Sequence, residues 1–513
     1  MNAISSQQHA PTALVVGAGL GGLSAAIRLR ALGYDVEIIE ALEQLGGRAS
    51  VFKRDGYTFD AGPTVVTAPY LLDELYNLVG RRREESIELL PVDPFYRVEY
   101  ADGSHFDYVG DEERILAQIE QMNPRDVDGY RRLAAHSKRI FDIGYSELAH
   151  VPFDRLADMF RVAPDMMRLK NYRSVYGLVS SYIKDERLRQ AFSFQPLLVG
   201  GNPFKTSSIY LLIHWLERKW GVHYAKGGTG AIVQGLGDLF RSIGGRIRLN
   251  SPVEQIVVKD GRATGVVLEG GGQIDADIVV CNADPSTVYR NYVDAKWRRK
   301  HSDRAVNRKR QSMSLFVAYF GTKKTYPDLK HHTIILSDRY KQLLWDIFER
   351  KTLADDFSLY LHAPTRTDAS MAPPGHEAFY VLSPVPNDEG DTEWTDEKND
   401  AYRNKILDFL DKTHLPGLRE NLTVDFSVDP RYFSGRLRSY KANAFGLEPV
   451  LTQSAYFRYH NRSEDVDGLY FVGAGCHPGA GMPGVITSAK VLEAVVPKLA
   501  AHERYHIPAG VLA

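Results

Sequence analysis

Cysteine is scarce in this chain of 513 residues, since only Cys281 and Cys476 are present, 195 residues apart and with no CxxC pair. A disulfide framework and a thiolate site for zinc or an iron–sulfur cluster are therefore excluded, and we expect no metal site. Net charge is also nearly absent, because 63 Lys and Arg face 64 Asp and Glu. No overall field attracts an acidic ligand, and without a nucleic-acid-binding motif we expect no nucleic-acid partner.

Long hydrophobic runs are missing as well. The stretch from Asn2 to Ile27 has no charged side chain, but its first dozen residues are polar and its apolar part contains four glycines. That apolar part is shorter than the ~20 residues of a membrane span, and no basic segment precedes it. We expect no signal peptide, no transmembrane helix and a cytoplasmic location. The chain can still lie on a membrane surface.

The beginning of the chain has the pattern of a βαβ unit. An apolar run at 13–16 enters a glycine cluster, and the periodic Leu20, Leu23 and Ile27 then predict a helix. A second strand is predicted at 36–40. Strand, tight turn, helix and strand within about 30 residues are typical of a parallel sheet.

The rest of the chain divides into a helical part and two groups of strands. Helical periodicity dominates from about Glu112 to Trp220. A strand at 469–472, followed by a glycine-rich turn and a helix from Gly484, repeats the pattern of the N-terminus. Further strands are predicted at 247–249, 253–258, 265–268 and 278–280, and a second sheet at 315–320, 358–362 and 379–385.

The glycine cluster fits the GxGxxG pattern of dinucleotide-binding turns. Gly17 permits the tight turn, Gly19 lets the backbone approach a pyrophosphate, and Gly22 lets the helix pack closely on the strand. Glu40 ends the second strand, where it can accept hydrogen bonds from a ribose diol and repel a 2′-phosphate. The alternative is a purely structural turn, but the strand, the helix and Glu40 in register favour a dinucleotide other than NADP.

Five residues after Glu40 the sequence reads Gly46-Gly47-Arg48. Adjacent glycines free the backbone near a cofactor, and the arginine offers a forked donor for phosphate. This spacing resembles the FAD-containing superfamily of amine oxidases, protoporphyrinogen oxidases and carotenoid desaturases. The likeness to bacterial and fungal phytoene desaturases extends from about residue 12 to 499 and is carried by segments 57–64, 191–204, 226–230, 448–454 and 473–486.

The resemblance implies an α/β fold with three parts. A Rossmann-like FAD-binding domain would be discontinuous, with pieces at 12–75, 225–295 and 440–505. A substrate domain with a mixed sheet would be inserted at 76–130 and 296–439. A helical subdomain at 131–224 would face the membrane.

Site residues follow from the same resemblance, position by position. Pro63 and Thr64 would lie near the isoalloxazine, and the backbone of Val253 would contact the adenine. The ADP half would be held by Gly17, Gly19, Leu20, Gly22, Glu40, Gly47 and Arg48. The ribityl chain and flavin would be surrounded by Gly475, Met482, Gly484, Val485 and Ile486.

The activity that the resemblance implies is carotenoid biosynthesis. Phytoene, a long apolar polyene, would lose a hydride and a proton in successive steps, giving neurosporene and/or lycopene. The electron acceptor would be oxygen or a quinone, and the protein, alone or as a homo-oligomer, would lie on lipid at the inner face of the cell membrane. Two alternatives stay open: a desaturase or isomerase acting on another polyene, and a prenyl-chain binding protein without catalytic activity.

Segment 171–224 contains ten aromatic residues, a density well above that of the whole chain. Basic residues are concentrated at 161–190 and 291–310. Aromatic and basic side chains together suit an anionic bilayer surface and an apolar tunnel mouth. An ordinary helical core with a solvated face explains the same pattern, and the sequence does not decide between them.

For the proton step, the best candidate pair is Asp158 and Arg161, three residues apart on one helix face beside the aromatic segment. A surface ion pair worth a few tenths of a kcal/mol is an equally good interpretation. Other candidates are His332, Glu448 and His477.

Overall fold

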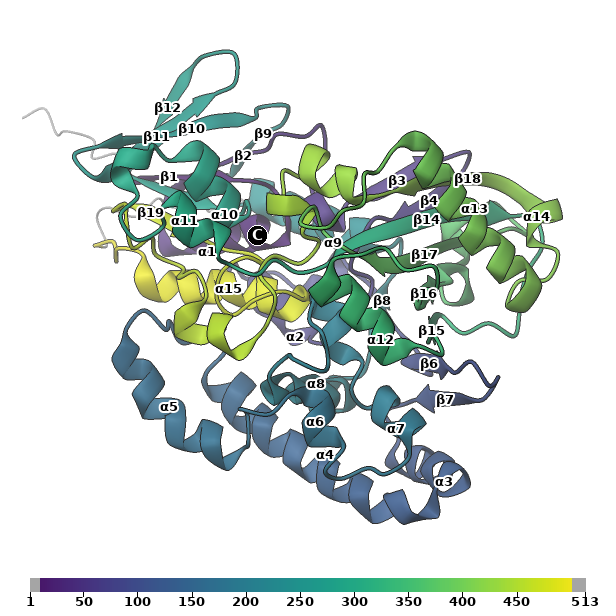
Figure 1. The fold of residues 1–513 in the computed structure, drawn as a ribbon. Coiled ribbons are helices and arrows are strands. Elements are labelled where there is room, and N and C mark those ends of the chain that lie inside the picture. The colour runs from purple at the N-terminus through teal and green to yellow at the C-terminus, as the bar shows by residue number, and fades with distance from the viewer. Residues whose placement is uncertain (1–9, 501–513) are drawn as a thin grey trace, which may run out of the picture.

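Five parallel strands in the order β19–β13–β1–β2–β9 form the first layer of the computed structural model, which describes residues 10–500 (Figure 1). Each coincides with a predicted strand. Their bounds are β1 Thr12–Val16, β2 Asp35–Ile39, β9 Arg246–Arg248, β13 Ile278–Cys281 and β19 Leu469–Phe471. The sheet thus combines three distant parts of the chain. The domain boundaries stay a prediction, and 1–9 and 501–505 lie outside the described residues.

Alternation along the strands places different side chains on the two faces of this sheet. Ala13 and Val15 of β1 pack in the core that includes α1 (Leu20–Leu32), α9 (Thr229–Ser242) and α15 (Met482–Val495). Leu14 and Val16 face the opposite side, where the antiparallel strands β10 (Val253–Lys259), β11 (Arg262–Leu268) and β12 (Gln273–Asp275) supply apolar residues. Figure 1 shows α1 and α15 beside each other below the sheet.

A second, mixed sheet of seven strands has the order β18–β14–β17–β16–β15–β6–β7, with only β15 and β6 parallel. The three predicted strands are confirmed as β14, β16 and β17, whereas the other four were not predicted. The bounds are β6 Tyr96–Glu99, β7 His105–Tyr108, β14 Ser314–Thr322, β15 His332–Ile335, β16 Leu359–His362, β17 Glu377–Val385 and β18 Leu422–Val428. Two short pairs complete the sheets: β3 (Val51–Arg54) with β4 (Tyr57–Asp60), and β5 (Leu89–Pro91) with β8 (His223–Ala225).

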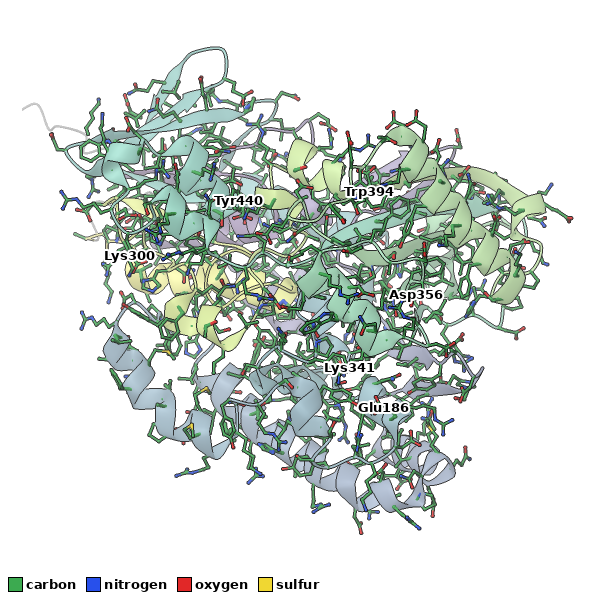
Figure 2. All side chains as sticks on the ribbon, in the orientation of Figure 1. Glu186, Lys300, Lys341, Asp356, Trp394 and Tyr440 are labelled. Carbon is green, nitrogen blue, oxygen red and sulfur yellow. The ribbon has the colours of Figure 1, made fainter. Side chains whose placement is uncertain are left out.

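One face of the mixed sheet is covered by α13 (Asp396–Thr413). Phe316 on β14 points to this face, and its ring centroid lies 5.6 Å from that of Trp394, which is labelled in Figure 2. Leu315 and Val317, the residues on either side of Phe316, point to the other face and belong to a different apolar cluster. That other face is therefore available to form a wall of the site.

The predicted helical stretch is confirmed and forms the lower layer in Figure 1. Its helices are α3 Glu112–Met122, α4 Val127–Phe141, α5 Leu156–Arg168, α6 Val175–Val179, α7 Glu186–Ala191 and α8 Leu212–Trp220. Within residues 10–500, no helix combines the length and the apolar character that crossing a bilayer requires.

Candidate active site

A single continuous cavity of about 550 Å³ runs from the parallel sheet to the helical layer. At one end its lining comes from the glycine turn after β1, the end of β2 and the start of α15. At the other end the lining comes from the free face of the mixed sheet and from α5 and α8. The volume lies within the ~300–1,000 Å³ range of small-molecule sites.

The glycine turn is built as the motif predicts. Gly17 has a φ of +98°, and its N–H donates to the Ile39 carbonyl at 2.8 Å. A Cβ at Gly22 would lie 2.0 Å from the Gly17 carbonyl oxygen, so the helix could not pack this closely with any other residue. A Cβ at Gly19 would meet the Asn282 amide at 2.7 Å. The turn leaves the N-terminus of α1 facing the cavity, the arrangement that binds a pyrophosphate.

Glu40 lies at the end of β2 and is nearly completely buried. Its carboxylate accepts the Ala18 N–H at 2.6 Å and the Leu42 N–H at 2.9 Å, one on each oxygen. Burial raises the pKa of Glu40 despite these hydrogen bonds. Each oxygen keeps a lone pair for a ribose hydroxyl. Val253, at the start of β10, lines the cavity beside it, because the Ser251 N–H donates to the Glu40 carbonyl at 2.9 Å.

Arg48 is a half-buried cation at the same end of the cavity. Its Nη2 donates to the Ser439 hydroxyl at 2.7 Å, whereas its Nε has no partner among the described residues. Burial lowers the pKa of Arg48, and the nearby Asp284 raises it. A buried, unsatisfied guanidinium N–H matches a phosphate oxygen of a dinucleotide.

The second glycine turn leads into α15, whose N-terminal residues Met482, Gly484 and Val485 line the cavity. Unpaired amides at this helix end can stabilise negative charge on a reduced flavin. Gly475 does not line the cavity, since it packs where a Cβ would lie 2.2 Å from Pro285. Gly22 and Ile486 also lie outside the lining, and the other predicted FAD residues are part of it. The donors, the buried carboxylate and the glycine cradle fit FAD.

Pro63 and Thr64 both line the cavity. The Thr64 hydroxyl is 3.0 Å from the hydroxyls of Tyr360 on β16 and Tyr380 on β17. The Pro63 carbonyl accepts the Thr229 hydroxyl at 2.5 Å. This segment is therefore fixed between the mixed sheet and α9, with two tyrosines that sequence reasoning did not identify.

The other half of the cavity is mainly apolar. The sheet contributes Leu315, Val317, Ile334, Leu359 and Leu382, and the helices contribute Met159, Val162, Met166, Ile213 and Leu216. Of the aromatic segment 171–224, Phe194 and Tyr210 line the cavity, whereas Phe192 and Tyr224 are core residues and Tyr172 is exposed. Most of that aromatic density is thus core and cavity wall rather than outer surface.

The predicted catalytic pair lies on α5 but does not line the cavity. The Asp158 carboxylate and the Arg161 guanidinium are 3.6 Å apart, and the Arg161 side chain is 65% exposed. The residues of α5 that do reach the cavity are Met159, Val162 and Met166. A catalytic role for Asp158 and Arg161 stays a prediction, and the geometry is that of a surface ion pair.

The other candidates occupy different surroundings. Glu448 is buried, forms an ion pair with Arg310 at 2.7 Å and does not line the cavity. His477 does line it, and burial lowers its pKa to about 3. His332 belongs to a buried cluster with His331 and His362, and its Nδ1 lies 2.6 Å from the Tyr360 hydroxyl. It can therefore orient Tyr360 from behind the cavity wall.

Glu217 is a cavity residue that sequence reasoning missed. It is fully buried on α8, four residues after Ile213 and eight after Ile209, which lies in the short 3-10 helix before α8. The sequence signal that could have identified Glu217 is a carboxylate in line with two isoleucines on an otherwise apolar helix face.

Comparison with known proteins agrees with this geometry. The family described as flavin containing amine oxidoreductase matches residues 20–491. The chain belongs to this family. It is 49% identical to a lycopene-forming phytoene desaturase of Pseudescherichia vulneris, over 93% of this chain and 97% of the relative. It is 43% identical to a neurosporene-forming phytoene desaturase of Rhodobacter capsulatus, over 94% of each chain.

Among solved structures, an oxidoreductase from Methanosarcina mazei shares the fold, with a TM-score of 0.61, 18% identity and coverage of 94% of this chain and all of the other. Family membership and the cradle described above make FAD the cofactor and the protein an oxidoreductase. The predicted α/β fold class is confirmed.

Proposed function

We propose that this protein is an FAD-dependent phytoene desaturase that forms neurosporene and/or lycopene. The observation that carries the proposal is the single cavity that joins an end fitted to FAD with an end lined by aliphatic and aromatic side chains. A hydrocarbon offers no group for an ion pair, so shape and apolar contact must position it. The relatives named above are phytoene desaturases by their own descriptions and resemble this chain over nearly its full length.

Bound FAD supplies the two-electron oxidation, and the protein supplies the positioning. Gly17, Gly19, Glu40 and Arg48 would hold the ADP half, in an FAD-binding domain assembled from both ends and the middle of the chain. Thr64, fixed by the two tyrosine hydroxyls, would support the region where the flavin meets the polyene. The apolar wall excludes water from that region and presents successive carbons of the chain.

Helix α5 would place the mouth of this cavity against lipid. Its outer side exposes Leu156, Phe160 and Met167, and its inner side lines the cavity. Arg161 and Arg168 are exposed beside those apolar residues. Apolar and basic side chains on one amphipathic helix suit an anionic bilayer surface, such as the inner face of a cell membrane. A substrate dissolved in lipid would enter there without crossing water.

The second basic stretch, 291–310, contributes less to such a surface. Arg298 is paired with Asp303, Lys300 with Glu464 and Arg310 with two glutamates. We therefore assign the membrane contact to α5 rather than to this stretch.

The test is to incubate the purified protein with FAD, liposomes and phytoene, with and without oxygen, and with an added quinone. We expect a flavin absorbance band and products with more conjugated double bonds, formed when either oxygen or quinone is present. Protein that stays colourless and leaves phytoene unchanged would refute the proposal. Conversion of another polyene but not phytoene would indicate a different carotenoid substrate. Sedimentation of the liposome-bound protein would show whether it forms a homo-oligomer.

A further inference from the structure

Desaturation removes two hydrogens from neighbouring carbons, and the structure offers a destination for the second. We propose that Glu217 accepts the proton that the polyene loses, an inference that rests on the proposed function. FAD, held by Gly17, Gly19, Glu40 and Arg48, would supply the oxidation by accepting one hydrogen as a hydride, together with the electron pair of its C–H bond. The adjacent C–H bond breaks, its electron pair forms the new double bond, and its proton passes to Oε2 of Glu217. The flavin is the oxidant, so no other reagent is required.

Glu217 is placed for this role by α8, which carries Ile213 and Leu216 along the same cavity wall. Its Oε1 accepts the Tyr96 hydroxyl at 2.7 Å. Its Oε2 is buried and has no hydrogen-bond partner among the described residues. One oxygen is therefore held in position, and the other is free to take a proton.

Among the residues that the structure describes, no other carboxyl or imidazole group lining the cavity suits the apolar end. Glu40 and Asp284 lie at the nucleotide end, and both are engaged with hydrogen-bond donors of the protein. His477 lines the cavity, but burial lowers its pKa to about 3, which makes it a weak base. Glu217 is left as the base at the end where the hydrocarbon would lie.

Within residues 10–500, no cation forms an ion pair with Glu217. Arg218, the next residue, turns to Glu112 at 2.6 Å and packs over Tyr130. His214, on the same helix, is kept neutral by burial and shares a hydrogen bond with Tyr108. Burial raises the pKa of Glu217 to about 8, although the hydrogen bond from the Tyr96 hydroxyl favours its charged form.

That environment suits a general base working near neutral pH, since the effective pKa of a catalytic base lies close to the operating pH. A buried carboxyl group with no ion pair is costly to the fold. Groups of this kind in a cavity are concentrated at functional sites. The absence of an ion pair at Glu217 among the described residues thus has an explanation in the chemistry of the cavity.

The experiment measures the rate of anaerobic flavin bleaching by phytoene in liposomes as a function of pH, with FAD content and melting temperature recorded for each variant. For Glu217→Gln we expect a rate at least 100-fold lower, because general acid–base catalysis contributes ~10²–10⁴-fold. The matched control is Glu186→Gln, which also replaces a carboxylate that accepts a tyrosine hydroxyl, that of Tyr176 at 2.7 Å, but at an exposed site on α7 (labelled in Figure 2). Its rate should equal that of the wild type.

A second variant separates a proton acceptor from a structural residue. In the wild type the rate should rise with pH, with a midpoint near the pKa of about 8 of Glu217. Tyr96→Phe removes a hydrogen bond that favours the carboxylate, so the midpoint should shift to higher pH. This shift tests whether Glu217 accepts the proton even if Glu217→Gln does not fold.

Two outcomes overturn the inference: a Glu217→Gln rate equal to that of the wild type, or a midpoint that Tyr96→Phe leaves in place. A wild-type enzyme that does not oxidise phytoene refutes the proposed function instead, whatever the variants do.

Discussion

Phe160 offers a direct measurement of membrane contact, because it is 71% exposed on the outer side of α5 while its neighbours Met159 and Val162 line the cavity. Replacing it by alanine keeps a good helix former and removes most of the exposed apolar surface at that position. Because most of the Phe160 ring is exposed in the folded protein, its removal should not change the melting temperature. The change in membrane affinity should then report only on contact with lipid.

The expected magnitude follows from the exposed fraction. Full burial of a phenylalanine side chain is worth ~1.5–3 kcal/mol. The 71% of Phe160 that is still exposed can therefore contribute about 1–2 kcal/mol on entering the bilayer. A loss of that size weakens binding by about tenfold.

Each exposed basic residue near an anionic surface adds about 1 kcal/mol. Arg168→Gln should therefore weaken binding to anionic vesicles and have little effect on neutral ones.

The assay is co-sedimentation of the FAD-loaded protein with liposomes, titrated in lipid concentration. Trp345→Ala is the matched control, because Trp345 is 46% exposed on α12 (Tyr340–Trp345), which lies apart from α5 in Figure 1. We expect Phe160→Ala to bind about tenfold more weakly and Trp345→Ala to bind like the wild type. Equal binding by wild type and Phe160→Ala, or an equal loss in both variants, would show that α5 is not the contact surface.

Two further predictions concern cofactor binding and stability. Gly22→Ala places a Cβ 2.0 Å from the Gly17 carbonyl, so the purified protein should lose most of its flavin absorbance, whereas Gly435→Ala, with open space around it, should retain it. The lowered pKa of His477 means that the unfolded chain binds a proton below about pH 6.5 while the folded chain stays neutral until about pH 3. Stability should therefore fall on acidification, by on the order of 1 kcal/mol between pH 7.5 and 5.5 from this residue. Urea unfolding should show that His477→Asn reduces this fall and that the exposed His105→Asn does not.

The nucleotide end of the site could be predicted because its constraints are local in sequence. A positive φ at Gly17 and the contact of Gly22 with the Gly17 carbonyl both arise within six residues. Glu40 is fixed by the strand that follows the same helix. Backbone geometry of this kind excludes other residue types, so it leaves a pattern that can be recognised without the fold.

The helical part could be predicted only as far as its periodicity. Aromatic density at 171–224 indicated either a core or a membrane surface, and the structure shows mostly core, with Phe192 and Phe194 packed against strands of the mixed sheet. The exposed apolar residues are concentrated instead on α5, which has fewer aromatics. Composition cannot distinguish the two cases, because a side chain is exposed or covered according to which distant segment packs on it.

Glu217 shows that the same limit applies to a residue proposed to act in the reaction. Its partner Tyr96 comes from a strand 121 residues earlier, and that strand was not among the predicted ones. In the sequence it is one of several glutamates near a helix end, as ordinary as Glu186. The packing of β6 and β7 against α8 removes it from water and raises its pKa, and this packing joins segments that are far apart in the sequence. The residue types that bind the cofactor are set by backbone shape, whereas the residue proposed to move the proton is set by burial, and burial is a property of the whole fold.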